Sequence, residues 1–317
     1  MELIDIVISI YNQEKIIDKV LYGVIKNTTT YFNLILVFDG CTDKSMSRAL
    51  GYLKQDNIPL LKDLRIATTL NVYETKANNT GFKLGTEKYL ITIQDDMVIE
   101  ERGWERRITY PLRRYNDVFS VTGRTALNLR FDKNTENPIY FDIAGREYLT
   151  LKRNIFAVRS GINRGPIAFR ADILKKLNYL DELFAPAQFD EFDLVLRAYK
   201  QYGLKSGVFQ IDYRSDLAWG KTRQSESSMN TNATYEKNIA LLKNRHEQLL
   251  SGTGRIFENR IICKKEIDYK KTDFLLIKKY KRLRADTRFL NCYLRRKIIL
   301  LKHYIKSYIS KISGRAI

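Results

Sequence analysis

The chain has 317 residues, of which 44% are hydrophobic, so it can bury the core of one large domain or of one domain with an appended tail. It contains no apolar run of roughly eighteen residues and no signal-like start, which predicts a cytoplasmic protein. The formal net charge of +19 suggests an anionic partner, but residues 264–317 hold 17 Lys and Arg against 4 Asp and Glu, or +13 of the total, so the body is only mildly basic.

Apolar strands alternate with helices through the first hundred residues. The predicted strands are 4–10, 34–38, 64–68 and 89–93, and the predicted helices are 13–25, 43–53 and 80–86. Strands that are almost continuously apolar and alternate with helices form largely parallel sheets covered on both faces. The sequence therefore predicts an α/β fold whose ligands bind at the carboxyl ends of the strands.

Carboxylates follow two of these strands. Asp39 comes after the second strand, and Asp95 and Asp96 come after the fourth, so we expect them to face one crevice. Two histidines and three widely spaced cysteines nearly exclude zinc, which leaves oxygen ligands for any metal. A carboxylate pair can hold Mg²⁺ or Mn²⁺ against a diphosphate leaving group, although such a pair alone is more often a helix cap or a solvated turn.

The rest of the chain is less regular. Between residues 104 and 161 the pattern indicates mixed strands and polar loops, and further on it predicts helices at 171–177 and 192–201, the second ended by Gly203. The polar stretch 225–234 is the best candidate for a boundary region. We expect a catalytic domain at 1–222, with halves at about 1–100 and 101–222, and a helical, basic extension at 223–317.

Six ordered segments resemble glycosyltransferase family 2, which has the GT-A fold, over roughly the first 215 residues. These segments are Val7–Glu14, Leu36–Asp43, Asn79–Gly81, Gln94–Asp96, Asn163–Arg170 with Leu180–Phe184, and Asp190–Arg197. The resemblance implies a GT-A-like sheet flanked by helices. It also implies an inverting, metal-assisted transfer of a sugar from a nucleotide diphosphate sugar, most simply a UDP-sugar.

The resemblance also implies roles for individual residues. Asp39 would contact the base or ribose, Asp96 with Asp95 would bind the metal, and Glu191 or Asp190 would be the general base. The nucleotide-binding residues would be Ser9, Tyr11, Asn12, Glu14, Asp39, Asn79 and Asp95, with Lys76 or Lys83 meeting the diphosphate.

Three positions depart from the family pattern. Gln94 stands where the family's metal motif has its first Asp, and Asn78 stands where the family has Arg. The usual Glu-Asp pair is reversed as Asp190-Glu191, so Glu191 holds the position of the base. Asp193, three residues into this segment, reads instead as a helix partner of Arg197 at the i,i+4 spacing.

The predicted partners are a nucleotide sugar donor and a glycan or lipid-linked acceptor. Apolar residues from Leu294 to Ile312 recur every three or four positions, which predicts an amphipathic helix. This helix either binds the inner face of an anionic membrane through residues 264–317 or packs on protein. The alternatives to an active transferase are an inactive GT-A-like scaffold and a nucleic-acid-binding protein, although no recognition motif supports the latter. A sugar-nucleotide nucleotidyltransferase would need a Gly-rich loop where the chain has Tyr11–Glu14.

Overall fold

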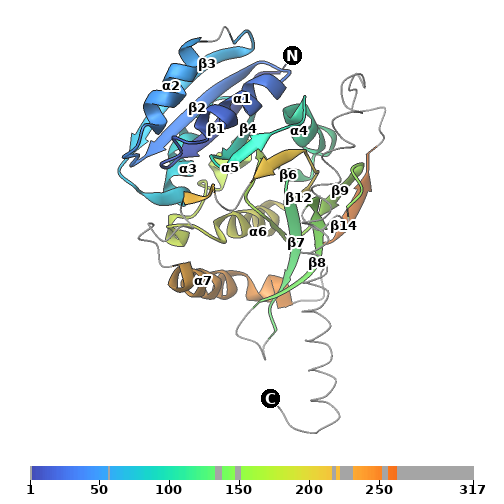
Figure 1. The fold of residues 1–317 in the computed structure, drawn as a ribbon. Helices are drawn as coiled ribbons and strands as arrows, with labels where there is room; N and C mark the ends of the chain where they lie inside the picture. The colour runs from blue at the N-terminus through green and yellow to red at the C-terminus, as the bar shows by residue number, and fades with distance from the viewer. Residues whose placement is uncertain are drawn as a thin grey trace, which may run out of the picture. The chain divides into compact units, whose positions relative to one another are not determined.

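A nine-stranded mixed sheet forms the centre of the structure (Figure 1). The computed structural model describes residues 2–55, 58–132, 138–146, 151–215, 219–221, 231–251 and 256–262. The strand order in this sheet is β14-β9-β12-β6-β11-β4-β1-β2-β3. Two smaller sheets, β10-β7-β8 and β13-β5, accompany it in the described part of the chain.

The first half of the chain forms the predicted parallel β-α repeats. Its elements are β1 (Ile4–Ile10), α1 (Ile17–Asn27), β2 (Phe32–Asp39), α2 (Ser45–Gln55), β3 (Leu61–Thr69), α3 (Tyr73–Lys83) and β4 (Tyr89–Gln94). Strand β1 pairs in parallel with both β2 and β4, and β2 pairs in parallel with β3. The predicted α/β fold class is therefore confirmed.

Both faces of these strands are buried because their side chains alternate in direction. Ile6 and Ile8 of β1 lie in one apolar cluster with Leu21 of α1, whereas Val7 lies in a second cluster with Phe82 of α3. Helices α1 and α3 consequently cover opposite faces of the sheet (Figure 1). The almost continuous apolar runs of β1 and β2 have this cause.

Helix α3 begins seven residues before the predicted helix at 80–86, and helix α4 (Trp104–Arg114) was not predicted at all. Pro111 and five charged residues obscure the apolar stripe of α4, yet Trp104, Ile108 and Leu112 lie at spacings of four and are buried. The other predicted helices exist with ends shifted by a few residues. Gly203 ends α6 in a left-handed conformation with φ of 66°, as expected.

The second half of the chain adds strands of both directions. Its elements are β5 (Met97–Ile99), β6 (Val118–Thr122), β7 (Thr125–Arg130), β8 (Ile139–Gly145), β9 (Ile155–Val158), β10 (Gly161–Ile162), β11 (Ile167–Arg170), α5 (Ala171–Lys176), η2 (Glu182–Phe184), α6 (Asp190–Tyr202), β12 (Lys205–Val208), β13 (Tyr213–Ser215), α7 (Thr231–Ser251) and β14 (Glu258–Ile261). Strand β11 lies antiparallel between β4 and β6, and β12 runs parallel to β6.

The compact unit extends past the predicted boundary at residue 222. It comprises Met1–Ile267, because β14 pairs with β9 and α7 packs on α6. Buried Asn238 of α7 donates to the carbonyl oxygens of Phe184 and Ala187, each at 2.7 Å. The second unit, Asp268–Ile317, and the predicted amphipathic helix within it lie outside the described residues.

Buried Asp193 also joins α6 to α7, through an ion pair with Arg245 at 3.3 Å and a hydrogen bond with His246. Asp193 is fully buried and pairs with Arg197 at 2.7 Å, as its spacing predicts, and with His246 of α7 at 2.9 Å. No described helix combines the length and the apolar character that crossing a bilayer requires.

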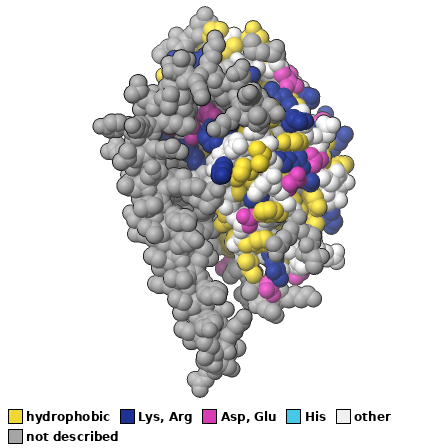
Figure 2. All heavy atoms as spheres, turned by 90° about the vertical axis from the view of Figure 1, so that its right-hand side faces the viewer, with side chains coloured by type: hydrophobic (Ala, Val, Ile, Leu, Met, Phe, Trp, Pro, Cys, Tyr) yellow, Lys and Arg dark blue, Asp and Glu magenta, His cyan; other side chains and the backbone are white. Residues whose placement is uncertain are grey.

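The edge strand β14 carries a cluster of paired charges. Arg260 contacts Asp117 at 2.6 Å, and Lys205 contacts Glu258 at 3.0 Å. Charged side chains on an edge strand discourage pairing with another chain. On the face seen in Figure 2, the described Lys and Arg side chains lie interspersed with Asp and Glu side chains, as expected for a mildly basic body.

Candidate active site

The carboxyl ends of β1, β2 and β4 meet at a cavity of about 80 Å³. Its lining comes from these strand ends, from α3 and from two loops of the second half of the chain, and includes Ser9, Tyr11, Asp39, Asp95, Asp96 and Arg164. The structure therefore brings Asp39 and the Asp95-Asp96 pair to one crevice, as the strand pattern predicts.

Asp95 is tied to the loop that follows β1. Its Oδ2 accepts a hydrogen bond from the backbone N–H of Tyr11 at 2.8 Å, and its Oδ1 accepts one from Nε2 of Gln13 at 3.3 Å. Burial raises the pKa of Asp95 well above its ordinary value, and the charges of Asp96 and Glu74 raise it further. Asp96 is 7% exposed and lines the same cavity.

These carboxylates suit a hard divalent cation. Of the four acidic side chains that line this small cavity, Glu74, Asp95 and Asp96 lie together, and their mutual repulsion is the kind that Mg²⁺ or Mn²⁺ relieves. Within the described ranges, no three Asp, Glu, His or Cys side chains converge closely enough to hold a metal by themselves. An ion would thus have one or two protein ligands and fill its shell with water and phosphate oxygens.

Asp39 caps helix α3. Its Oδ1 accepts from Oγ1 of Thr69 and the backbone N–H of Val72, both at 2.7 Å, and its Oδ2 accepts from the N–H of Tyr73 at 2.8 Å. A carboxylate offers about four acceptor sites, so three are in use within the protein. Asp39 therefore lines the cavity and also stabilises the start of α3, which leaves about one acceptor site, and its predicted contact with the nucleotide stays a prediction.

The four predicted residues of the β1 loop divide into two pairs. Ser9 and Tyr11 line the cavity, and the Ser9 hydroxyl donates to Oδ1 of Asn78 at 2.9 Å. Asn12 and Glu14 instead bind the turn after β2: Oδ1 of Asn12 accepts from the N–H of Thr42 at 2.8 Å, and Oε2 of Glu14 accepts from the N–H of Lys44 at 3.1 Å. These two residues shape the loop and do not line the cavity.

Lys76 and Asn79 do not line the cavity either. Lys76 is exposed on α3. Asn79 is buried, and its amide clamps a distant segment by donating to the carbonyl of Leu180 at 2.8 Å and to Glu182 at 3.2 Å while accepting from the N–H of Leu180 at 3.0 Å. In this geometry the side of α3 that carries them faces solvent or the 180–182 segment, and their predicted contact with the nucleotide stays a prediction.

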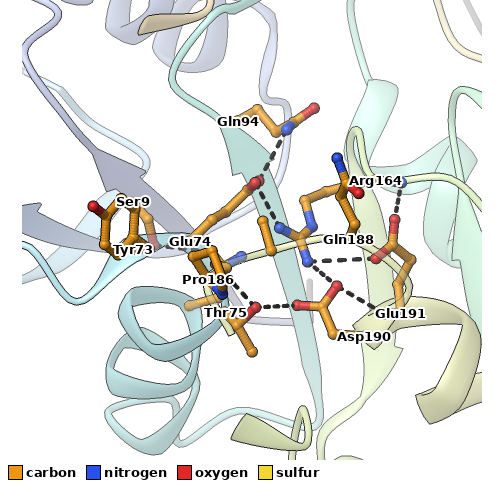
Figure 3. A network of polar contacts seen from close by, with 12 residues as sticks. Ser9, Tyr73, Glu74, Thr75, Gln94, Arg164, Pro186, Gln188, Asp190 and Glu191 are labelled. Atoms are coloured by element: carbon orange, nitrogen blue, oxygen red, sulfur yellow. Dashed lines mark hydrogen bonds and ion pairs between the residues drawn. The ribbon is translucent and has the colours of Figure 1, made fainter. Parts of the chain in front are cut away.

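Arg164 is the centre of an ion network (Figure 3). Its guanidinium contacts Oε2 of Glu74 at 2.6 Å, Oδ1 of Asp190, and Oε2 of Glu191 at 3.4 Å. Its backbone N–H also donates to Oε1 of Glu191 at 3.1 Å. Since Arg164 lines the cavity and is only 9% exposed, it joins the acidic corner to the first turn of α6.

The two carboxylates of that turn differ in proton affinity. Burial raises the pKa of Glu191 well above its ordinary value, and neighbouring Asp190 adds to the rise while Arg164 opposes it. The pKa of Asp190 is lowered: burial opposes ionisation, but the charge of Arg164 and hydrogen bonds from Glu191 and Thr75 outweigh it. Asp190 thus remains ionised, and Glu191 is the stronger proton acceptor.

Four residues lie at the site without a predicted role. Glu74, Arg164 and Lys221 line the cavity, and Gln13 holds the chain beside Lys221 by donating to the carbonyl of Trp219 at 2.8 Å. Arg164 lies inside a segment that resembles the family, which was an available signal. Glu74 and Lys221 had none, because their partners are far away in the sequence.

A family model described as glycosyl transferase family 2 matches residues 5–178. Glycosyltransferase GlyG of Streptococcus pneumoniae serotype 4 (strain ATCC BAA-334 / TIGR4) is 26% identical over 148 residues, which are 46% of this chain and 46% of that protein. The match thus spans less than half the length of this curated relative.

A solved structure of low sequence identity shares the fold. The mannosyltransferase PcManGT from Pyrobaculum calidifontis, in complex with GDP-Man and Mn²⁺, superposes with a TM-score of 0.50 and 11% identity over 80% of this chain and 65% of that one. Glucosyl-3-phosphoglycerate synthase from Mycobacterium tuberculosis gives a TM-score of 0.49 and 14% identity over 77% and 79%. Since the family model spans more than half of the sequence and the predicted fold is confirmed, this chain belongs to glycosyl transferase family 2.

Proposed function

We propose that this chain transfers a sugar from a nucleotide diphosphate sugar to a hydroxyl group of a glycan or lipid-linked acceptor, with inversion at the anomeric carbon. The observation that carries the proposal is the meeting, at one cavity of a family 2 chain, of the Asp95-Asp96 corner with Arg164 and the Glu191 behind it. The Asp95-Asp96 corner is suited to hold a diphosphate with its cation, and Glu191 is suited to accept a proton.

Asp96, with Asp95, is the proposed holder of Mn²⁺ or Mg²⁺. When bound, such an ion would neutralise the charge that develops on the departing diphosphate. The Pyrobaculum mannosyltransferase was solved with GDP-Man and Mn²⁺, which supports this cofactor and donor class by analogy of fold. The cavity of about 80 Å³ is smaller than the roughly 300 Å³ or more of most small-molecule sites, so the donor would extend beyond it.

Glu191 is the proposed general base. The acceptor oxygen forms its bond to the anomeric carbon on the face opposite the diphosphate, the bond from that carbon to the diphosphate oxygen breaks, and the acceptor proton moves to Glu191. A carboxylate of raised pKa is suited to take that proton near neutral pH. Asp190 remains ionised and, with Arg164, holds Glu191 in place.

A catalytically inactive, nucleotide-binding scaffold is the second candidate. Gln94 favours it, because an amide replaces one carboxylate at the metal corner and the described residues offer no three-ligand cluster. In either case residues 264–317 are a proposed basic contact for an anionic membrane, which would suit a lipid-linked acceptor.

A calorimetric titration with UDP, with and without Mn²⁺, tests the site, and a screen of UDP- and GDP-sugars for hydrolysis or transfer tests the activity. We expect Mn²⁺-dependent UDP binding that Asp96→Asn abolishes. The matched control is Asp172→Asn, which removes the same charge from an exposed position on α5 and should bind as the wild type does. Nucleotide binding without any turnover, whether or not it depends on Mn²⁺, would support the scaffold, and the absence of any nucleotide binding would refute both candidates.

A further inference from the structure

Gln94 leaves the acidic corner one carboxylate short, and a second element lies where it can compensate. Glu74, on the first turn of α3, lines the same cavity as Gln94, Asp95 and Asp96. Its Oε1 accepts a hydrogen bond from Nε2 of Gln94 at 2.9 Å (Figure 3). A carboxylate thus stands one hydrogen bond away from the position at which the charge is missing.

This hydrogen bond fixes the orientation of the Gln94 amide. A carboxylate can only accept, so the NH₂ group must face Glu74 and the carbonyl oxygen must point away from it. That oxygen, Oε1, is buried and has no hydrogen-bond partner among the described residues. A buried acceptor left without a partner is unfavourable, and a bound ion or water is one explanation for such an atom.

We propose that Glu74 and Gln94 act together as a divided carboxylate, in which Glu74 supplies the negative charge and Gln94 supplies the oxygen that faces a divalent cation. The inference rests on the proposed function, because it assigns two residues to the metal corner of that site. Glu74 acts one contact away from the ion, in agreement with the lack of a three-carboxylate cluster in the described part of the chain. Partners of this kind, which orient a ligand, commonly change metal affinity by about 10–100-fold.

A competing explanation is that Glu74 serves only Arg164. Each carboxylate oxygen of Glu74 has its own partner, since Oε2 contacts Arg164 at 2.6 Å and Oε1 accepts from Gln94. Exchanging the two side chains separates the explanations. The double variant E74Q/Q94E keeps one carboxylate and one amide in hydrogen-bonding reach but deprives Arg164 of its Glu74 partner.

The experiment measures Mn²⁺ affinity in the presence of UDP by calorimetry, with thermal unfolding as the test of folding. We expect E74Q to bind Mn²⁺ about tenfold or more weakly, and E74Q/Q94E to return to within about threefold of the wild type. Glu236→Gln is the matched control, because it removes a carboxylate from an exposed position of α7. Gln94→Leu is a further arm that leaves the Glu74–Arg164 pair intact, and it should weaken binding as E74Q does.

Each other outcome has one meaning. Wild-type affinity in E74Q or in Gln94→Leu overturns the divided carboxylate while the proposed function stands. Equal weakness in E74Q and in the exchanged variant assigns Glu74 to Arg164 and overturns it too. If E74Q does not fold, Gln94→Leu and the exchanged variant decide. A wild-type protein that binds UDP without regard to Mn²⁺ refutes the proposed function itself.

Discussion

Replacing Arg164 by Gln should destabilise the protein strongly, because three carboxylates lose their shared cation. Arg164 is 9% exposed and Asp190 is fully buried, so water does not replace the lost charge. Removing one partner of a buried ion pair costs about 3–5 kcal/mol. At about 2–4 °C per kcal/mol for a domain of this size, the melting temperature should fall by about 6–20 °C.

The matched control is Arg48→Gln. Arg48 pairs with Asp18 on the surface, where the two side chains are 47% and 34% exposed. An exposed pair contributes about 0–1 kcal/mol, so the control should melt within about 4 °C of the wild type. Differential scanning fluorimetry or circular dichroism at one pH and one salt concentration measures both variants side by side.

The stability that Arg164→Gln loses should also depend on pH in a defined direction. In the wild type the charge of Arg164 lowers the pKa of Asp190, so that carboxylate stabilises the fold above its unfolded pKa of about 3.9, and the contribution is lost as the pH falls through the lower, folded value. Without Arg164 the folded pKa rises, and the repulsion among the carboxylates grows as they ionise. The fall in melting temperature of Arg164→Gln relative to the wild type should therefore be larger at pH 8 than at pH 5. A variant that melts with the wild type at pH 8, or whose deficit grows in acid, would refute this account of the network.

Three further predictions concern the base, a close contact and a clamp. Glu191→Gln should abolish sugar transfer while leaving Mn²⁺-dependent UDP binding intact, which transfer rates and calorimetry measure. The wild-type transfer rate should rise with pH through a midpoint above about 4.3, because burial raises the pKa of Glu191, and rate measurements across pH check this profile. Gly81→Ala should lower the free energy of unfolding in urea by about 1–3 kcal/mol, because its Cβ would lie 2.3 Å from Cγ1 of Val7. The Cβ of the control Gly51→Ala meets nothing within 4 Å, so this variant should raise the free energy of unfolding by about 0.5–1 kcal/mol. Equal effects of the two variants would contradict the packing argument. Asn79→Ala should lower the free energy of unfolding by about 1–3 kcal/mol, because the backbone N–H and carbonyl of Leu180 lose their partner. The folded variant should bind UDP in calorimetry as the wild type does, and weakened binding would support the predicted contact of Asn79 with the nucleotide.

The first half of the fold could be predicted because its signals are local. The strand β1 and helix α1 carry an apolar periodicity that a short window of sequence reveals. The start of helix α3 was predicted too late because Asn78 and Asn79, just before residue 80, are weak helix formers. Its true start is stabilised by Asp39, which accepts from the N–H groups of Val72 and Tyr73 more than thirty positions away.

The candidate site was predicted only in part, for a related reason. Strand ends place carboxylates at a crevice, which is enough to bring Asp95 and Asp96 together. The partner that a side chain contacts within the crevice comes from a distant segment: Glu74 pairs with Arg164, ninety positions away, and Asn79 donates a hydrogen bond to the carbonyl of Leu180. A family motif likewise indicates where a residue lies, whereas the direction of its side chain on a helix decides whether it lines the cavity, and Lys76 does not.

The reversed strand β11 makes the site sensitive to strand register. Arg164 precedes β11 by three residues, and β11 pairs with β4 so that Ile167 lies opposite Thr92, two positions before Gln94. A slip of β11 by two residues would keep every side chain on its own face, so burial alone discriminates weakly against it. The same slip would move Arg164 by about 7 Å, far out of reach of Glu74 and Asp190, and would leave their charges buried without a cation. The ion network therefore favours the native alignment of β11 on β4 over the slipped one, in addition to any part it has in sugar transfer.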